Sequence, residues 1–127
     1  PVGPAVCGDV ARQYRNQLAT VRGLSVAHGF AVFFFWQPAL ATTHKPLTEW
    51  ERAVLKDHPV SRLMAPCTDS VEAVTPGEGF TSLRTLFDGD TTTVFLDQWG
   101  HITETSNRVM ASLIVERLLP GLGSHSR

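Results

Sequence analysis

An aspartate and a histidine stand close together in the stretch VFLDQWGHITETSN, residues 94–107, and their types permit acid-base chemistry. Histidine exchanges its proton nearest to neutral pH. A carboxylate partner fixes its tautomer and stabilises the imidazolium that forms when the ring acts as a base. We therefore treat His101 as a candidate general base and Asp97 as the candidate residue that orients it.

The same pair could serve a metal ion, because two residues four apart share one face of a helix. Gly100 and the strand-like residues before Asp97 argue against a helix here, and no second His or Cys pair is near. The other histidines stand in no metal-ligand spacing: His28, His44, His58 and His125. We expect neither a metal nor a cofactor.

Two further groups are weak candidates for a nucleophile. Ser106 lacks the glycine pattern of a strand-to-helix nucleophile elbow. Cys7 could pair with His101, but free cysteines usually act as small buried hydrophobes. We expect Asn107 to tie the loop to the next helix, and Trp36 and Gln37 to serve packing more than a pocket.

Charge and hydropathy exclude two kinds of partner. Eleven basic and twelve acidic side chains give a net charge of −1, with no run of like charges that could follow a phosphate backbone. The longest apolar run, FAVFFFW, has seven residues, whereas a membrane-spanning helix needs roughly 20. We expect no nucleic acid and no membrane span.

Cys7 and Cys67 define neither a disulfide framework nor a zinc signature, so their pairing stays open.

The apolar periodicity predicts four helices and three β-prone runs. The first helix is expected at 9–28, with Asp9 as N-cap and Gly29 as its stop, and the second from Thr48 to before Pro59, with a Thr48/Glu51 capping box. A short third helix is expected to end at about Val74 with Pro66 in its first turn, and the last helix is expected at 105–119. The β-prone runs are expected at 30–36, which reads as a strand buried on both faces, at 80–87, and at 91–96.

This alternation predicts a single α/β domain over residues 1–127, with a mostly parallel sheet covered by helices on both faces. Residues 120–127 are expected to form a frayed tail. Ligands bind such sheets beyond the carboxyl ends of the strands, and the Asp97–His101 pair directly follows a β-prone run.

Three segments together resemble the SGNH/GDSL hydrolases. VFLDQWGHITETSNRVMASLIVERL is similar to their closing block of strand, Asp, His, Thr-Glu-Gly-Asn-like turn and final helix. AHGFAVFFFWQPAL followed by KPLTEWER is similar to their buried strand, Gln-Pro and Lys-x-Leu-Thr-x-x-Glu segment. FTSLRTLFDG resembles the short element that precedes their Asp-His loop. The resemblance spans about residues 9–119.

The resemblance implies a three-layer, flavodoxin-like fold and an esterase or acyl hydrolase in which His101 is the base and Asp97 orients it. An ester or an O-acylated small molecule or carbohydrate is the implied substrate. The Gly-Asp-Ser and Gly-x-Asn-Asp blocks that supply the family's nucleophile and oxyanion hole are not found among these 127 residues. We therefore expect this chain to be the C-terminal part of a longer hydrolase, and a chain that begins without methionine fits that expectation. Alone, the chain is expected to be inactive.

Two smaller departures concern spacing. The family's pattern is Asp-x-x-His, whereas three residues separate Asp97 from His101, and Ser106 stands where the family has glycine. The alternative from another class is a non-catalytic α/β domain that binds a carbohydrate or a partner protein. Localisation and oligomeric state stay open.

Overall fold

The computed structural model describes residues 3–56, 59–75 and 79–122. The elements in these ranges are α1 (Pro4–His28), β1 (Phe34–Trp36), α2 (Glu49–Lys56), α3 (Pro59–Val74), β2 (Phe80–Ser82) and α4 (Glu104–Leu122). The two strands pair in parallel, with Phe34 opposite Phe80 and Trp36 opposite Ser82. The predicted α/β class and parallel pairing are confirmed. Within the described residues, the sheet has two strands.

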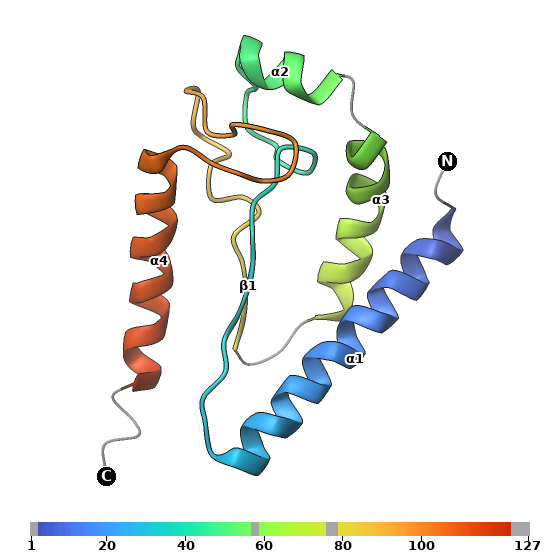
Figure 1. Cartoon of the computed structure of the whole chain (residues 1–127), viewed down its shortest axis with the longest axis vertical. Helices are drawn as coiled ribbons and strands as arrows, with labels where there is room; N and C mark the ends of the chain where they lie inside the picture. The colour runs from blue at the N-terminus through green and yellow to red at the C-terminus, as the bar shows by residue number, and fades with distance from the viewer. Residues whose placement is uncertain (1–2, 57–58, 76–78, 123–127) are drawn as a thin grey trace.

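Helices lie on both sides of the strand pair. In Figure 1 the strands run between α4 on one side and α1 with α3 on the other, and α2 lies across one end. Tyr14 of α1 packs edge-on against Trp36, with ring centroids 5.3 Å apart. The prediction of a strand at 30–36 buried on both faces is wrong, because only 34–36 are strand and all three residues are half-buried. A two-stranded sheet is too small to cover a strand on every side.

α1 begins earlier than predicted. Gly3 is its N-cap, so Asp9 lies inside the helix and forms an exposed ion pair with Arg12 at 2.5 Å. Proline at the first helical position favours this early start, since it lacks the N–H that would have no partner there. The predicted stop at Gly29 is confirmed: its φ is 69°, in the left-handed region, and its N–H donates to Ser25 O.

α3 runs through Pro66, so the prediction that this proline lies in the first turn of a helix is wrong. A proline inside a helix removes one backbone hydrogen bond. Packing of α3 against α1 offsets this loss: Val71 is buried, and Cys67 forms a disulfide with Cys7 of α1. Cys7 and Cys67, whose pairing the sequence left open, therefore form a disulfide.

The C-terminal third differs from prediction in three segments. The β-prone run at 80–87 is a strand only over 80–82 and continues as turns. The run at 91–96 is not a strand; Phe95 forms a single antiparallel bridge with Ile102. α4 continues to Leu122, through the Pro120 that was expected to lie beyond its end. Pro120 lies in the last turn and has no N–H to donate to the carbonyl of Glu116, four residues before it. Glu116 is exposed, so water can bond to that carbonyl instead. The rest of the predicted tail, 123–127, lies outside the described residues.

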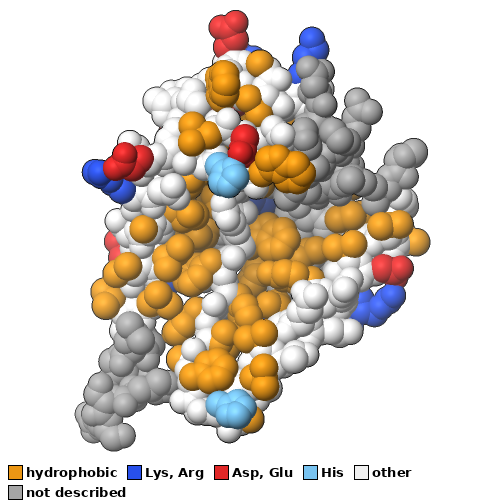
Figure 2. All heavy atoms as spheres, in the orientation of Figure 1, with side chains coloured by type: hydrophobic (Ala, Val, Ile, Leu, Met, Phe, Trp, Pro, Cys, Tyr) orange, Lys and Arg blue, Asp and Glu red, His pale blue; other side chains and the backbone are white. Residues whose placement is uncertain are grey.

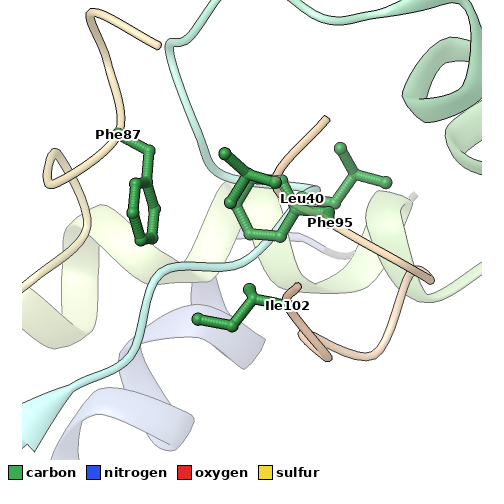
Figure 3. Packing of buried hydrophobic residues seen from close by; sticks show 5 residues of the cluster. Leu40, Phe87, Phe95 and Ile102 are labelled. Carbon is green, nitrogen blue, oxygen red and sulfur yellow. The ribbon is translucent and has the colours of Figure 1, made fainter. Parts of the chain in front are cut away.

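The main hydrophobic core lies beneath the loop that carries Asp97 and His101. It consists of residues from the loop after β1, the turn after β2 and the segment 94–102: Leu40, Phe87, Val94, Phe95 and Ile102. In Figure 3 four of these side chains converge from separate parts of the chain. Phe87 and Phe95 meet edge-to-face, with ring centroids 6.5 Å apart. The core therefore supports the candidate site directly.

Candidate functional site

Asp97 and His101 contact each other, although three residues separate them in the sequence. His101 Nδ1 lies 2.5 Å from Asp97 Oδ2. Nδ1 is the ring nitrogen that faces the carboxylate, so Nε2 points away from it. The His101 side chain is 76% exposed and that of Asp97 is 32% exposed. The pair thus presents an oriented imidazole at the surface.

The second carboxylate oxygen of Asp97 holds the loop backbone. Oδ1 accepts hydrogen bonds from the amides of Trp99, at 2.8 Å, and His101, at 3.2 Å. The hydrogen bond from the His101 ring is the largest cause that keeps the pKa of Asp97 below its ordinary value, and the two amides act in the same direction. Asp97 is therefore an anion over a wide pH range, which is what an imidazole partner needs.

The loop closes on itself through backbone hydrogen bonds. Leu96 N donates to His101 O and Thr103 N donates to Val94 O, both at 2.8 Å. Gly100 has a φ of 97°, a conformation that favours glycine. A Cβ added there would lie 3.4 Å from Gln37 Nε2. The tight turn and the close approach of Gln37 together explain a glycine at this position.

Gln37 fixes the loop to the carboxyl end of β1. Its Nε2 donates to Gly100 O at 2.7 Å. Beside this contact is an open hollow of about 210 Å³ lined by the residues after β1 and by the loop: Trp36, Gln37, Pro38, Ala39, Trp99 and Gly100. Trp36 and Gln37 therefore line this hollow and also make packing contacts, Trp36 with the ring of Tyr14 and Gln37 with Gly100. The Asp97–His101 loop lies beyond the end of a parallel strand, where ligands bind in α/β sheets.

Glu51 was expected only to serve the helix start, but its side chain has further partners in the structure. The predicted capping box is confirmed, since Thr48 N donates to Glu51 Oε2 at 2.9 Å and Glu51 N to Thr48 Oγ1 at 3.3 Å. Glu51 also forms an ion pair with Lys45 at 2.6 Å, and both side chains have no exposed surface. The Lys-x-Leu-Thr-x-x-Glu segment contains both Lys45 and Glu51, but their spacing in the sequence does not indicate that the two side chains pair or that they are buried.

The buried carboxylate reaches the loop of the candidate site. Glu51 Oε1 accepts hydrogen bonds from Val94 N at 2.9 Å and Phe95 N at 3.1 Å. Burial by itself raises the pKa of Glu51, but the hydrogen bond from Lys45 and those from the backbone amides outweigh burial and lower the pKa to about 2. Val94 and Phe95 give their amides to Glu51, which explains why 91–96 does not pair as a strand.

The other residues singled out from the sequence lie outside the Asp97–His101 pair. Cys7 is in a disulfide and cannot act as a thiolate nucleophile. Ser106 is buried at the start of α4, where it contacts Thr103 Oγ1 at 2.8 Å. Asn107 Nδ2 donates to Ile102 O at 3.4 Å, a structural tie as predicted. His58 and His125 lie outside the described residues. No serine in the described ranges hydrogen-bonds to the His101 ring.

The described residues contain no cluster of three or more side chains suited to a metal ion. Among the helices described, none combines the length and the apolar character needed to cross a membrane. In comparisons with known proteins, no family model, no curated protein and no solved structure matches this chain.

Proposed function

We propose that this chain supplies the acid-base half of a serine ester hydrolase of the SGNH type. The observation that carries the proposal is the 2.5 Å contact between Asp97 and Nδ1 of His101, which directs Nε2 outward. An imidazole held in this way can take a proton at Nε2 while the carboxylate stabilises the resulting cation. The two strands here would then belong to a larger three-layer, flavodoxin-like sheet.

The nucleophile in this proposal is a serine from a Gly-Asp-Ser block outside these 127 residues. Its Oγ attacks the ester carbonyl as His101 Nε2 takes the hydroxyl proton. The tetrahedral intermediate collapses, the bond between the acyl carbon and the alcohol oxygen breaks, and His101 returns the proton to the leaving alcohol. Water then attacks the acyl-serine with His101 again as base, which releases the carboxylic acid and restores the serine.

The hollow beside the loop is where we place part of the substrate. Its volume of about 210 Å³ is smaller than the roughly 300 Å³ at which pockets for drug-sized ligands begin. A short acyl group such as acetyl suits this space. Trp99, 61% exposed next to the pair, offers a flat apolar surface to the alcohol portion of the substrate.

The test uses the longest in-frame polypeptide that contains these residues, with hydrolysis of p-nitrophenyl acetate as the assay. We expect turnover that His101→Ala abolishes and that Asp97→Asn lowers by a factor on the order of 10⁴. His44→Ala is the matched control, because His44 is 65% exposed and lies 3.8 Å from Asp88 at the surface. The control should leave turnover unchanged.

The isolated 127-residue chain should show no turnover that depends on His101. Such turnover would overturn the proposed division of the site between two segments. If the longer reading frame carries no Gly-Asp-Ser block and its product binds an oligosaccharide equally well with alanine at position 101, the hydrolase proposal fails. The non-catalytic binding domain then replaces it.

A further inference from the structure

The buried carboxylate of Glu51 accepts more hydrogen bonds than the capping of α2 needs. A capping box uses one carboxylate oxygen, and Oε2 fills that role by accepting from Thr48 N. Oε1 instead accepts two amides that lie 43 and 44 residues further along the chain. An exposed carboxylate would cap the helix equally well. Burial of Glu51 therefore calls for a reason outside α2.

Lys45 makes this burial tolerable. Its Nζ donates to Glu51 Oε2 at 2.6 Å and to Pro46 O at 2.9 Å. A buried carboxylate without a cation would be strongly disfavoured, and a buried pair is maintained only when hydrogen bonds satisfy the remaining lone pairs. Here every polar side-chain atom that is fully buried among the described residues has a hydrogen-bond partner.

The two amides that Glu51 accepts lie at the base of the Asp97–His101 loop. Val94 and Phe95 have no exposed surface, so water cannot replace the carboxylate as their acceptor. Val94 O and Leu96 N close the loop through Thr103 N and His101 O. The backbone of 94–96 is therefore fixed by Glu51 on one side and by 101–103 on the other.

We propose that Lys45 and Glu51 are positioning residues for the Asp97–His101 pair: their buried ion pair clamps the amides of Val94 and Phe95 and so fixes the loop geometry that brings His101 Nδ1 onto the Asp97 carboxylate. This inference rests on the proposed function for its catalytic meaning. The effect of the ion pair on the loop geometry can be measured on the chain without any substrate.

The test is the Glu51→Gln variant with Glu72→Gln as matched control. Glu72 also forms an ion pair, with Arg84 at 3.0 Å, and also accepts a hydrogen bond, from Ser82, but it belongs to α3 and has no link to the loop. Both variants make the same chemical change. Glu51 is fully buried and Glu72 is 23% exposed, so Glu51→Gln can also lower the overall stability more. General destabilisation would speed hydrogen exchange in all helices, whereas an effect on the loop would be confined to the loop amides.

The readouts are the tautomer of His101, from the ¹⁵N shifts of its ring nitrogens, and hydrogen exchange of the loop amides. In the unmodified chain we expect the neutral ring to carry its proton on Nδ1, opposite Asp97. Glu51→Gln should shift the ring toward the Nε2–H form and speed exchange at Phe95 and Leu96 by at least about tenfold. Glu72→Gln should change neither. A folded Glu51→Gln chain with an unchanged tautomer and unchanged exchange would refute the inference.

Lys45→Met provides a second variant if Glu51→Gln does not fold. It keeps the aliphatic stem and the carboxylate, so a folded Lys45→Met chain with an unchanged His101 tautomer also refutes the inference. In the longer hydrolase we expect Glu51→Gln to lower kcat by a factor on the order of 100, with little change in KM. If His101→Ala abolishes turnover but Glu51→Gln does not lower kcat, positioning fails and the proposed function stands. If Glu51→Gln changes the His101 tautomer but the longer polypeptide has no esterase activity, the positioning inference stands and the proposed function fails.

Discussion

The disulfide between Cys7 and Cys67 should be a major source of stability, because it closes a long loop. The two cysteines are 60 residues apart in sequence and join α1 to α3. In the chain-entropy description, the cross-link removes an entropy that grows with the logarithm of loop length, and a loop of this size corresponds to about 4 kcal/mol at 25 °C. That is a large share of the roughly 5 to 15 kcal/mol that stabilises an ordinary domain.

Urea unfolding followed by circular dichroism checks this value. The oxidised chain is compared with the same chain after reduction, so that no atom of the core other than the cross-link is changed. For a slope of about 2 kcal/mol per M, the midpoint should fall by about 2 M on reduction. The double variant Cys7→Ala/Cys67→Ala should unfold near the reduced chain and should not respond to the reductant.

Two results would refute this reasoning. The first is a thiol assay that finds two free thiols in unfolded protein purified without reductant, since the cross-link would then not form. The second is a midpoint that is the same in the oxidised and reduced chains. In that case strain in the folded chain or residual structure in the unfolded chain cancels the entropy that the cross-link removes.

Three other perturbations have outcomes that denaturant unfolding can measure. Glu51 has its pKa lowered from an ordinary 4.5 to about 2, so its contribution to stability, about 3 kcal/mol by linkage, is complete above about pH 4.5 and is lost as the pH falls toward 2. This part of the acid dependence should be missing from Glu51→Gln. Gly100→Ala should cost about 1 to 3 kcal/mol because of its φ of 97°, whereas Gly89→Ala, with open space and no positive φ, should cost little. Phe95→Ala should cost about 3 to 5 kcal/mol because its side chain is fully buried, whereas Leu96→Ala, 49% exposed, should cost less than about 1 kcal/mol.

Local patterns predicted the features that depend on neighbouring residues. The stop of α1 at Gly29 and the Thr48/Glu51 capping box follow from backbone preference and from side chains three residues apart. The start of α1 at Pro4 was missed although proline at the first helical position is a local signal. The helix through Pro66 was missed because the contacts that stabilise it come from elsewhere in the chain. The disulfide at Cys67 and the packing against α1 compensate for a proline that a local rule treats as a helix breaker.

The candidate site was predictable in part for the same reason. The types of Asp97 and His101 and their place after a β-prone run were visible in the sequence, and the structure brings the two side chains together. The partners of Glu51 were not visible, because an oxygen that accepts amides 43 and 44 residues away leaves no local periodicity. The prediction of a strand at 91–96 was wrong for this reason: the amides of Val94 and Phe95 bond to the Glu51 side chain instead of a neighbouring strand.

A second surface pair shows what distinguishes the candidate site from a chance contact. His44 and Asp88 have exposures similar to those of His101 and Asp97, but their closest charged atoms are 3.8 Å apart, and His44 N donates to Asp88 Oδ1 at 3.4 Å. In the Asp97–His101 pair, one carboxylate oxygen lies 2.5 Å from the ring while the other accepts two loop amides. The base of that loop is in turn held by a buried ion pair. An imidazole on a loose surface contact loses its orientation with each rotation of its side chain, whereas one fixed through both carboxylate oxygens keeps Nε2 directed outward. Catalysis by a general base depends on that orientation. We therefore propose His101 and not His44 as the base, because the hydrogen bonds that hold the Asp97 carboxylate are absent from the looser His44–Asp88 contact.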